Sequence, residues 1–321
     1  MDNKNVPVIE TVGLKKYFKT SKGMLHAVDN ISLKIMQGET LGVVGESGCG
    51  KSTLGSTIIR LYEPDEGDIL FRGKSTLHLN RKEFKEMRNK MAMIFQDPYS
   101  SLNPRMTVLD LIADPMRVNH TYRTRSERYR RAAELMDIVG LAARVAGYYP
   151  HELDGGRRQR IGVARALALD PEFIVCDEPV SALDVSIQAQ ILNLLMDLQD
   201  DLGLSYLFIT HDMSVVRHIS NNIMVAYLGQ CVEYADRNRI FQNPCHPYTK
   251  ALLSAIPEPV LEARYERPQL LKGEIGNAID PKPGCRFAGR CPHCMPECTQ
   301  GDIPAFEVEP GHTVSCLLYQ K

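Results

Sequence analysis

A glycine-rich turn, set between an apolar run and a polar helix start, constrains this chain more than any other feature. Residues 40–44 are apolar and predict a buried strand, and residues 54–61 predict a helix. The residues between them fit the phosphate-loop pattern G-x-x-x-x-G-K-S/T. The candidate nucleotide contacts are Gly45, Glu46, Ser47, Gly48, Cys49, Gly50, Lys51, Ser52 and Thr53. Such a turn points backbone N–H groups at phosphate oxygens, while the lysine adds positive charge and the serine hydroxyl can bind Mg²⁺.

Composition limits the partners that a chain of this kind can have. The 321 residues are 44% hydrophobic, enough for one large domain with an appendage. The formal net charge of -1 provides no basic footprint, so we expect no nucleic-acid partner. No apolar run approaches the length of a membrane span, and the N-terminus lacks the layout of a signal peptide. We therefore expect a cytoplasmic chain whose association with a membrane, if any, is peripheral.

Hydrophobic patterning predicts an α/β fold with an antiparallel portion. Residues 8–18 and 26–35 alternate apolar and polar side chains around a short turn, which indicates two antiparallel strands. Buried strands are predicted at 91–95 and 173–176. The polar stretch between them, 100–150, has no strand signal and predicts a helical insertion.

Polar side chains follow three of the predicted strands. Gln96 ends one, the pair Asp177 and Glu178 ends the next, and His211 follows a strand predicted at 204–209. An open α/β sheet places its ligand at the carboxyl ends of its strands. Of the two adjacent carboxylates, one can orient a metal shell and the other can polarise an attacking water.

An aromatic residue near the N-terminus is a candidate for binding a nucleotide base. Tyr17 is suited to stacking on an adenine ring, and Phe18 is the neighbouring alternative. Packing within the sheet explains either residue equally well.

Two helix starts follow the helical region. Asp154 is a good N-cap for a helix that runs to Leu169, and Gly155 and Gly156 permit another backbone to approach closely. A second helix is predicted from about Asp184 to Leu202. Its apolar side chains recur at helical spacing and are predicted to face the core: Ile187, Ile191, Leu194, Leu198 and Leu202.

The cysteines are unevenly distributed. Five of the nine lie near the C-terminus, at Cys285, Cys291, Cys294, Cys298 and Cys316. In a cytosolic protein such clustering favours a metal site over disulfides. Four thiolates suit either a tetrahedral zinc ion or a 4Fe-4S cluster, and spacing alone does not choose between them.

Taken in order, these motifs resemble those of the ATP-binding cassette (ABC) ATPases of membrane transporters. The resemblance rests on the phosphate loop, Gln96, residues 153–156, the Asp177-Glu178 pair, residues 181–184 and His211. It implies a P-loop NTPase fold with an ABC-type antiparallel β subdomain and a helical insertion. It also implies ATP and Mg²⁺ as cofactors, with Mg²⁺ on Ser52 and Gln96.

The same resemblance assigns roles to individual residues. Tyr17 is similar to the adenine-stacking residue, Glu178 to the catalytic base and His211 to the switch histidine at the γ-phosphate. Asp184 belongs to a loop that crosses a dimer interface. In this family two cassettes sandwich two ATP molecules, so Asp154, Gly155 and Gly156 would reach the ATP held by a partner.

A narrower resemblance covers almost the whole chain. Residues 95–104, 181–190 and 243–253, together with the tail around Cys285 and Cys291, are similar to the dipeptide/oligopeptide importer ATPases, and most similar to the second of their two unequal ATPase subunits. The resemblance implies a heterodimer with a second ABC ATPase subunit, two transmembrane permease subunits and, indirectly, an extracytoplasmic solute-binding protein. The chain would then act at the cytoplasmic face of the cell membrane. Nickel or another small solute is the alternative cargo.

The resemblance also favours the cluster over zinc in the tail. Cys285, Cys291, Cys298 and Cys316 match the cysteine positions of the family tail, whereas Cys294 is an addition. The implied cofactor is a 4Fe-4S cluster, with Zn²⁺ as the alternative. A chain whose iron–sulfur site is mainly regulatory is a further alternative to a transport ATPase.

One motif departs from the family pattern. The signature usually reads Leu-Ser-Gly-Gly-Gln, but here Asp154 replaces the serine and Arg157 the glutamine. A carboxylate only accepts hydrogen bonds and repels phosphate, so the ATP site that this helix completes should turn over slowly.

The domain organisation follows from these assignments. We predict an ABC nucleotide-binding domain at 1–255, with its helical insertion at about 100–165, and a small cysteine-rich C-terminal extension at 256–321. The proline-rich run at 256–259 marks the boundary. A DNA-acting cassette would carry long heptad arms, which this chain lacks, and a ribosome-acting one usually has two cassettes in tandem.

Overall fold

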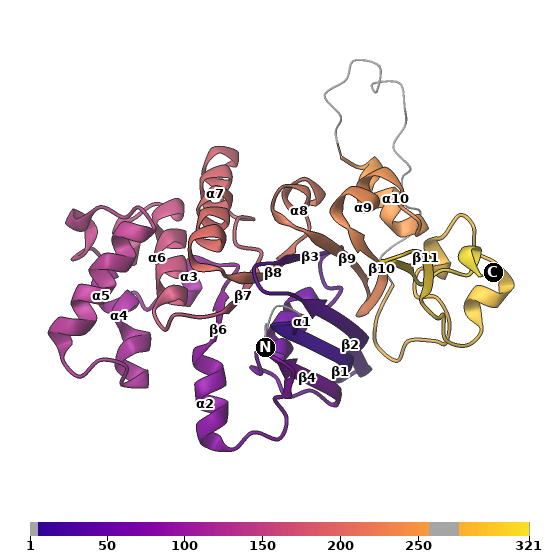
Figure 1. The fold of residues 1–321 in the computed structure, drawn as a ribbon. Coiled ribbons are helices and arrows are strands. Elements are labelled where there is room, and N and C mark those ends of the chain that lie inside the picture. Colours follow the sequence, from indigo (N-terminus) through magenta and orange to yellow (C-terminus); the bar gives the residue numbers. More distant parts are fainter. Residues whose placement is uncertain (1–5, 257–275, 321) are drawn as a thin grey trace, which may run out of the picture. The chain divides into compact units, whose positions relative to one another are not determined.

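The structure is a computed structural model that describes residues 6–256 and 276–320. The chain forms two compact units (Figure 1). The first unit comprises residues 1–9, 35–39 and 70–207, and the second comprises 10–34, 40–69 and 208–321. The proline-rich run that we predicted as a domain boundary lies, from Pro257 onward, outside the described residues.

Two long strands make up most of the start of the second unit. β1 (Ile9–Thr20) and β2 (Gly23–Ile35) are neighbours in one sheet, where β1 also adjoins β4 (Glu66–Phe71). Only two residues separate β1 from β2, and so short a connection joins antiparallel strands. The predicted antiparallel pair is therefore confirmed, with both strands longer than their alternating runs suggested.

A parallel pair of strands carries the glycine-rich turn in this unit. β3 (Thr40–Val44) is buried along its whole length and pairs in parallel with β9 (Asn222–Tyr227). Helix α1 (Lys51–Ile58) follows β3 after the turn. Beyond β9 the sheet continues through antiparallel strands β10 (Gln230–Asp236), β12 (His312–Val314) and β11 (Phe306–Glu309).

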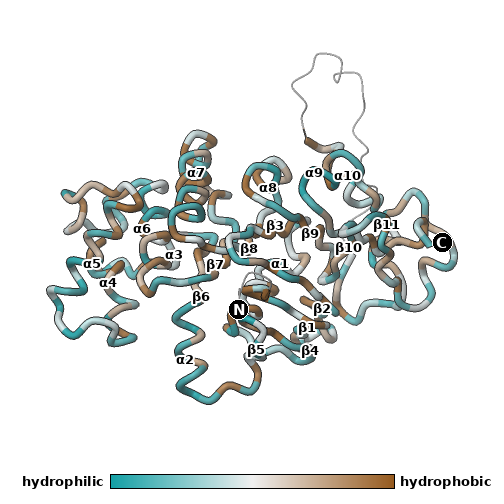
Figure 2. The backbone as a smooth tube through the Cα atoms, viewed as in Figure 1, coloured by the Kyte–Doolittle hydropathy of each residue, from teal (hydrophilic) through white to brown (hydrophobic). Residues whose placement is uncertain are grey.

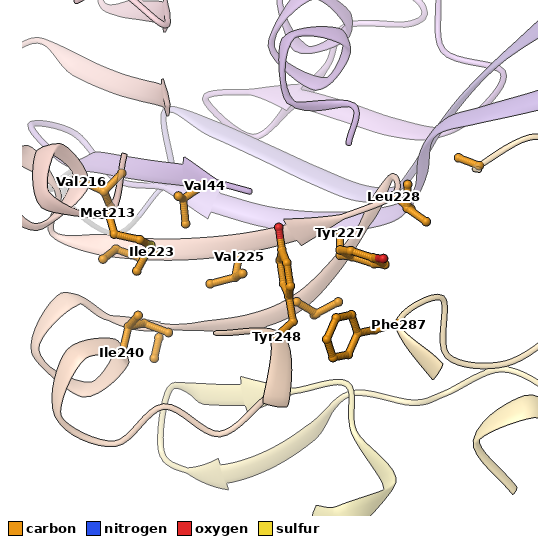
Figure 3. Packing of buried hydrophobic residues seen from close by; sticks show 13 residues of the cluster. Val44, Met213, Val216, Ile223, Val225, Tyr227, Leu228, Ile240, Tyr248 and Phe287 are labelled. Carbon is orange, nitrogen blue, oxygen red and sulfur yellow. The ribbon is translucent and has the colours of Figure 1, made fainter. Parts of the chain in front are cut away.

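Helices and the C-terminal tail enclose the core of the second unit. The helices are α8 (Met213–Ile219), α9 (Arg237–Gln242) and α10 (Pro247–Ser254). Figure 3 shows the rings of Tyr227, Tyr248 and Phe287 gathered at one end of this core. The ring centroids of Tyr227 and Tyr248 lie 4.7 Å apart, and Phe287 lies 5.3 Å from Tyr227. Because Phe287 belongs to the tail, the tail shares its core with the strands that carry the glycine-rich turn.

The first unit combines a parallel pair of strands with helices. β6 (Met91–Ile94) pairs in parallel with β7 (Phe173–Asp177). Ahead of β6, the short strand β5 (Lys74–Ser75) pairs with the end of β4, and α2 (Arg81–Asn89) follows. Figure 2 shows α2 largely in hydrophilic colours, and most of its side chains are exposed or half-buried.

Between β6 and β7 the described elements are helical. Four α-helices occur there: α3 (Pro98–Ser101), α4 (Val108–Asn119), α5 (Arg125–Ile138) and α6 (Gly155–Leu167). Helices α4, α5 and α6 pack against one another. Short 3₁₀ turns complete the chain, at Ala143–Val145 and Pro150–Glu152 here and at Ala288–Arg290, Pro296–Thr299 and Leu317–Tyr319 in the tail.

The helix that follows β7 corrects one prediction. α7 (Val185–Leu202) forms where a helix was predicted, but its buried face is made by Ile191, Leu192, Leu195 and Leu198. Leu202, predicted to lie in the core, is 53% exposed. It is the last helical residue, and Gly203 turns the chain away from the helix with a φ of 65°. The strand β8 (Ser205–Thr210) comes next, and no helix in the described part of the chain could cross a membrane.

Candidate functional site

The glycine-rich turn has the geometry of an anion site in the second unit. Gly50 is the N-cap of α1 with a φ of 96°, and no side chain caps the helix. A Cβ at Gly50 would lie 1.8 Å from the carbonyl oxygen of Ala27, so only glycine fits there. The first turn of α1 carries no acidic residue. Its N–H groups therefore present the positive end of the helix to a phosphate.

Lys51 places a positive charge inside this turn. The residue is only 5% exposed, and its Nζ donates to the carbonyl oxygens of Gly45 at 2.8 Å and Glu46 at 3.0 Å. Both acceptors are neutral, and a charged phosphate oxygen forms a stronger hydrogen bond with an ammonium group. The neighbouring Ser52, the predicted Mg²⁺ ligand, is exposed at the start of α1.

Tyr17, the predicted adenine-stacking residue, is fixed in the second unit from two sides. Its hydroxyl donates to Asp29 Oδ1 at 2.6 Å, and its ring stacks on His26 with centroids 4.0 Å apart. Burial and the hydrogen bond to Asp29 raise the pKa of the Tyr17 phenol, so it remains a neutral donor. The alternative, Phe18, packs edge-on against Tyr62. Adenine stacking stays a prediction, for which Tyr17 is the better-positioned residue.

In the first unit the structure brings two predicted catalytic residues together. Gln96 Nε2 donates to Glu178 Oε2 at 2.9 Å, although 82 residues separate them in sequence. Glu178 directly follows β7 with a φ of 44°, and it and Asp177 are buried, at 8% and 7% exposed. A non-glycine residue in this backbone region costs about 1–3 kcal/mol and persists only where its surroundings enforce it. Such strain is typical of a functional position.

The helix start at Asp154 forms as predicted. The Asp154 carboxylate caps α6 by accepting the N–H of Arg157 at 2.8 Å, and the Arg157 guanidinium lies 3.2 Å from its other oxygen. A Cβ at Gly156 would lie 2.8 Å from Ile187 Cγ2, so this glycine lets α6 approach α7 closely. Both charged side chains are about half exposed.

Two further predicted residues lie on the surface. His211 follows β8 directly and is exposed, and Asp184 precedes α7 and is also exposed. Next to Asp184, Val185 is 83% exposed, an unusual position for an apolar side chain. The roles of His211 and Asp184 stay predictions.

Four cysteines of the tail line one pocket in the second unit. They are the four predicted ligands, Cys285, Cys291, Cys298 and Cys316, whereas the fifth, Cys294, is exposed and does not line it. Burial raises the pKa of the Cys285 thiol to about 11, and it also raises the pKa values of Cys291 and Cys316. Thiols in such surroundings stay protonated unless a bound cation lowers their pKa.

The distances between ligand atoms bear on which metal group fits. Within 6–256 and 276–320, one group of three candidate ligand atoms lies within 4.8 Å of one another, and none of the four pocket cysteines belongs to it. Zinc–sulfur bonds of about 2.3 Å in a tetrahedron bring the four sulfurs within about 4 Å of each other. No three of the four pocket sulfurs therefore lie as close together as a preformed tetrahedral zinc site requires.

The three residues whose ligand atoms lie within 4.8 Å of one another are Glu233, Cys245 and His312. They form a buried hydrogen-bond network that the sequence analysis did not predict. One oxygen of Glu233 accepts the N–H of Cys245 at 2.7 Å and contacts His312 Nε2 at 2.8 Å, and the other accepts the N–H of His246 at 2.8 Å. The carboxylate is thus used by hydrogen bonds that join β10, α10 and β12. No local pattern signals it, because His312 lies 79 residues from Glu233 in sequence.

Sequence reasoning also gave no role to two arginines of the tail, Arg286 and Arg290. Arg286 pairs with Asp29, and Arg290 pairs with Glu46 inside the phosphate loop. Their positions directly after Cys285 and directly before Cys291 were the available signal.

Comparison with known proteins agrees with these features. Residues 28–181 match the family model described as ABC transporter. Residues 232–298 match the model described as oligopeptide/dipeptide transporter, C-terminal region. The solved structure of the ATP-binding cassette MJ0796, in a dimeric post-hydrolysis state bound to ADP and Pi, is similar with a TM-score of 0.65 and 31% identity. That match covers 71% of this chain and 98% of the other.

Curated relatives match over nearly the full length. A putative oligopeptide transport ATP-binding protein, YkfD of Bacillus subtilis (strain 168), is 50% identical over 99% of this chain and 97% of its own length. The oligopeptide transport ATP-binding protein OppF of Salmonella typhimurium (strain LT2) is 49% identical over 97% of this chain and 96% of its own length. Given these matches, the phosphate loop and the strained Glu178, the chain belongs to the ATP-binding cassette ATPases of the oligopeptide and dipeptide transporters.

Proposed function

We propose that this chain hydrolyses ATP to drive the import of oligopeptides through a membrane permease. The observation that carries the proposal is Glu178, buried and strained at the end of β7 and hydrogen-bonded by Gln96. The phosphate loop supplies the matching anion site. Relatives named as oligopeptide transport ATP-binding proteins support a peptide cargo over nickel or another small solute.

Each residue has a distinct task in this proposal. Lys51 and the first N–H groups of α1 would hold the terminal phosphates, and Ser52 and Gln96 would hold Mg²⁺, which would supply charge neutralisation at the phosphates. Glu178 orients and polarises the attacking water, while Tyr17 holds the adenine. His211 contacts the γ-phosphate. Because phosphoryl transfer depends on positioning and electrostatics, these contacts account for most of the catalysis.

The test is Glu178→Gln in the assembled transporter. We expect ATP binding to persist and steady-state hydrolysis to fall by at least 100-fold, about the effect of losing a positioned general base. Glu172→Gln is the matched control, since Glu172 lies just before β7 and pairs with Arg72 on the surface of the same unit. Hydrolysis that survives Glu178→Gln would show that another site does the work.

A groove in the first unit is the proposed docking site for the permease. A cavity of about 500 Å³ is lined by Met91, Phe95, Arg165 and Leu169, among others, and Phe95 is 40% exposed. Phe95 directly precedes Gln96, so a docked apolar segment would lie next to the proposed Mg²⁺ ligand. Phe95→Asp should abolish co-purification with the permease subunits while preserving ATP binding. Normal co-purification would remove the groove from the proposal.

The partner ATPase is proposed to be a second, different subunit. Asp154 would face the ATP held by that partner, and the ion pair with Arg157 neutralises part of its charge. We therefore propose impaired turnover at the partner's ATP and normal turnover at the Lys51–Glu178 site. Glu→Gln placed in each subunit separately should give unequal losses, and Asp154→Ser should raise turnover. Equal losses with no gain from the serine would mean that the two sites are equivalent.

The tail is proposed to hold a 4Fe-4S cluster on Cys285, Cys291, Cys298 and Cys316, with Zn²⁺ as the alternative. The group would supply redox-sensitive cross-linking of the tail. Anaerobic purification should give a brown protein with about four irons per chain, and Cys298→Ser should lose them. Cys294→Ser is the control and should retain the iron. A colourless protein with one zinc per chain would replace the cluster with the alternative.

The same proposal places the chain at the cytoplasmic face of the membrane, held there by its permease. It keeps 1–255 as the nucleotide-binding domain and 256–321 as the extension. Membrane fractionation with and without the permease subunits tests this: the chain should leave the membrane fraction when they are absent.

A further inference from the structure

Two arginines of the tail form ion pairs with acids of strand β2 and of the phosphate loop. Arg286 and Arg290 lie between Cys285 and Cys291, in a segment folded by its own backbone bonds: Ala288 N–H donates to Cys285 O at 3.0 Å and Arg290 N–H to Phe287 O at 2.9 Å. The cysteines at the two ends of this segment line the four-cysteine pocket. The two arginine side chains, by contrast, are paired with acids outside the tail.

Arg290 forms an ion pair with Glu46 of the phosphate loop. Its Nη1 and Nη2 contact the two carboxylate oxygens of Glu46 at 2.7 and 3.1 Å, and its guanidinium lies over the rings of Tyr227 and Phe287. The Arg290 side chain is only 9% exposed and that of Glu46 is 21% exposed. A bidentate pair with this little solvent fixes orientation as well as charge.

Glu46 connects this ion pair to the rest of the phosphate loop. Its N–H donates to the Tyr248 hydroxyl at 2.9 Å, and its carbonyl accepts from Lys51 Nζ at 3.0 Å. Its side chain, however, is a carboxylate in a loop that must bind anions. The guanidinium of Arg290 offsets the negative charge of this carboxylate.

Arg286 lies near Tyr17, the predicted adenine-stacking residue. It forms an ion pair with Asp29 and donates to the carbonyl oxygen of Leu228, and its side chain is 6% exposed. Asp29 in turn accepts the Tyr17 hydroxyl at 2.6 Å and lies 3.4 Å from His26, which stacks on Tyr17. Arg286 therefore holds Asp29 in place, and Asp29 in turn holds Tyr17, the predicted adenine-stacking residue.

We infer that Arg286 and Arg290 are positioning residues that couple the four-cysteine pocket to ATP binding, one through Tyr17 and the other through Glu46. The inference rests on the proposed metal site in one respect. A metal group bound to the four cysteines would hold residues 285–291 in the conformation in which both arginines reach their acids. Loss of the bound group would loosen both contacts together and lower the affinity for ATP. The tail thus regulates the nucleotide site of its own chain.

The first experiment measures Mg-ATP and Mg-tripolyphosphate binding to the full chain by calorimetry. Arg290→Ala should weaken both ligands by about 10- to 100-fold, the usual effect of losing a charged hydrogen-bonded pair. Arg286→Ala should weaken ATP by about 10-fold and leave tripolyphosphate unchanged, because its effect passes through the adenine side. Arg239→Ala is the matched control, since Arg239 also ties the tail to its surroundings: it joins α9 to the tail through Glu309 at 3.9 Å and the carbonyl of Pro310.

A double variant distinguishes charge neutralisation by Arg290 from a purely structural role. Glu46→Gln in the Arg290→Ala background should restore at least half of the lost affinity on a logarithmic scale, because the unneutralised carboxylate is gone. A purely structural Arg290 would show no such rescue. Unchanged affinity in Arg290→Ala, or equal effects of Arg286→Ala on ATP and tripolyphosphate, would overturn the inference.

The second experiment tests the link to the cysteines. Cys298→Ser should weaken ATP by the same order as Arg290→Ala, and the double variant should be no weaker than the stronger single one. If Cys298→Ser does not fold, removing the metal from the unmodified chain with a chelator gives the same comparison. Unchanged ATP affinity after metal loss would overturn the coupling. A purified chain without iron or zinc would instead overturn the proposed metal site, and the arginine variants would still decide the positioning roles.

Discussion

Two helices in this molecule have glycine at or directly after the N-cap, and the two N-termini differ in how they satisfy their free N–H groups. α1 begins at Gly50 with no side-chain cap, beside the buried ammonium of Lys51. α6 begins at Asp154, whose own carboxylate caps the helix and is paired with Arg157. A helix N-terminus binds an anion with the N–H groups that its cap leaves free. The N-terminus of α1 is therefore suited to bind a phosphate, while the N-terminus of α6 is already occupied by the Asp154 carboxylate.

Burial separates the two starts as well. Lys51 is 5% exposed, whereas the side chains of Asp154 and Arg157 are 59% and 49% exposed. Electrostatic contacts strengthen as solvent is excluded, so the same change of charge should matter far more at α1. The four changes below test this difference, from the largest expected effect to the smallest.

Lys51→Ala should have the largest effect on ATP binding. Removing the buried ammonium deletes charged hydrogen bonds to the terminal phosphates, so the Kd for Mg-ATP should rise by at least about 100-fold. Equilibrium binding of a fluorescent ATP analogue measures it. Lys82→Ala is the control, because Lys82 is 88% exposed on α2. An unchanged Kd would mean that the turn at α1 is not the phosphate site.

Gly50→Ala should unfold or strongly destabilise the chain. The new Cβ would lie 1.8 Å from a backbone carbonyl oxygen, and a φ of 96° is itself strained for alanine. We expect a loss of about 3 kcal/mol or more in the free energy of unfolding, measured by denaturant titration. Gly38→Ala is the comparison: its φ is 71° but nothing lies within 4 Å, so only the strain of about 1–2 kcal/mol should appear. Similar losses from both would show that contact with Ala27 is unimportant.

Asp154→Ala should cost about 0.5–2 kcal/mol of stability, because it removes the cap of α6. Asp154→Ser should lose little, since serine caps a helix about as well. Thermal unfolding of the three proteins measures both effects. If the Asp154→Ala variant is as stable as the unmodified chain, capping does not explain the carboxylate. Its effect on the partner's ATP site would then be the remaining explanation.

Gly156→Ala should have the smallest effect on stability, below about 1 kcal/mol. Its Cβ would lie 2.8 Å from Ile187 Cγ2, so the Ile187 side chain must shift, whereas at Gly50 the obstacle is a backbone carbonyl. The same unfolding measurement applies. A loss as large as that of Gly50→Ala would show that the two helix starts are equally rigid and would break the comparison.

Local sequence was enough to predict the elements that bear the chemistry. The phosphate loop is contiguous, and its glycines, lysine and serine are specified by backbone geometry within one turn. Strand ends at Gln96 and Glu178 followed from short apolar runs that stop at polar residues. The capping role of Asp154 was also predictable, because a cap acts on the next three residues.

Long-range contacts were not predictable in the same way. Gln96 and Glu178 meet across 82 residues, and Arg290 and Glu46 across 244. The buried face of α7 was misjudged at Leu202 for the same reason: periodicity gives a face, but the neighbouring elements decide where along the helix burial ends.

The sequence by itself determined the phosphate loop, the strand-end acids and the set of cysteines, because each depends on residues close together in the chain. Only the tertiary structure decided that four cysteines share a pocket and that Arg286 and Arg290 turn from it toward Asp29 and Glu46. A guanidinium finds its carboxylate through the packing of the core around Phe287, and such packing is a property of the whole second unit.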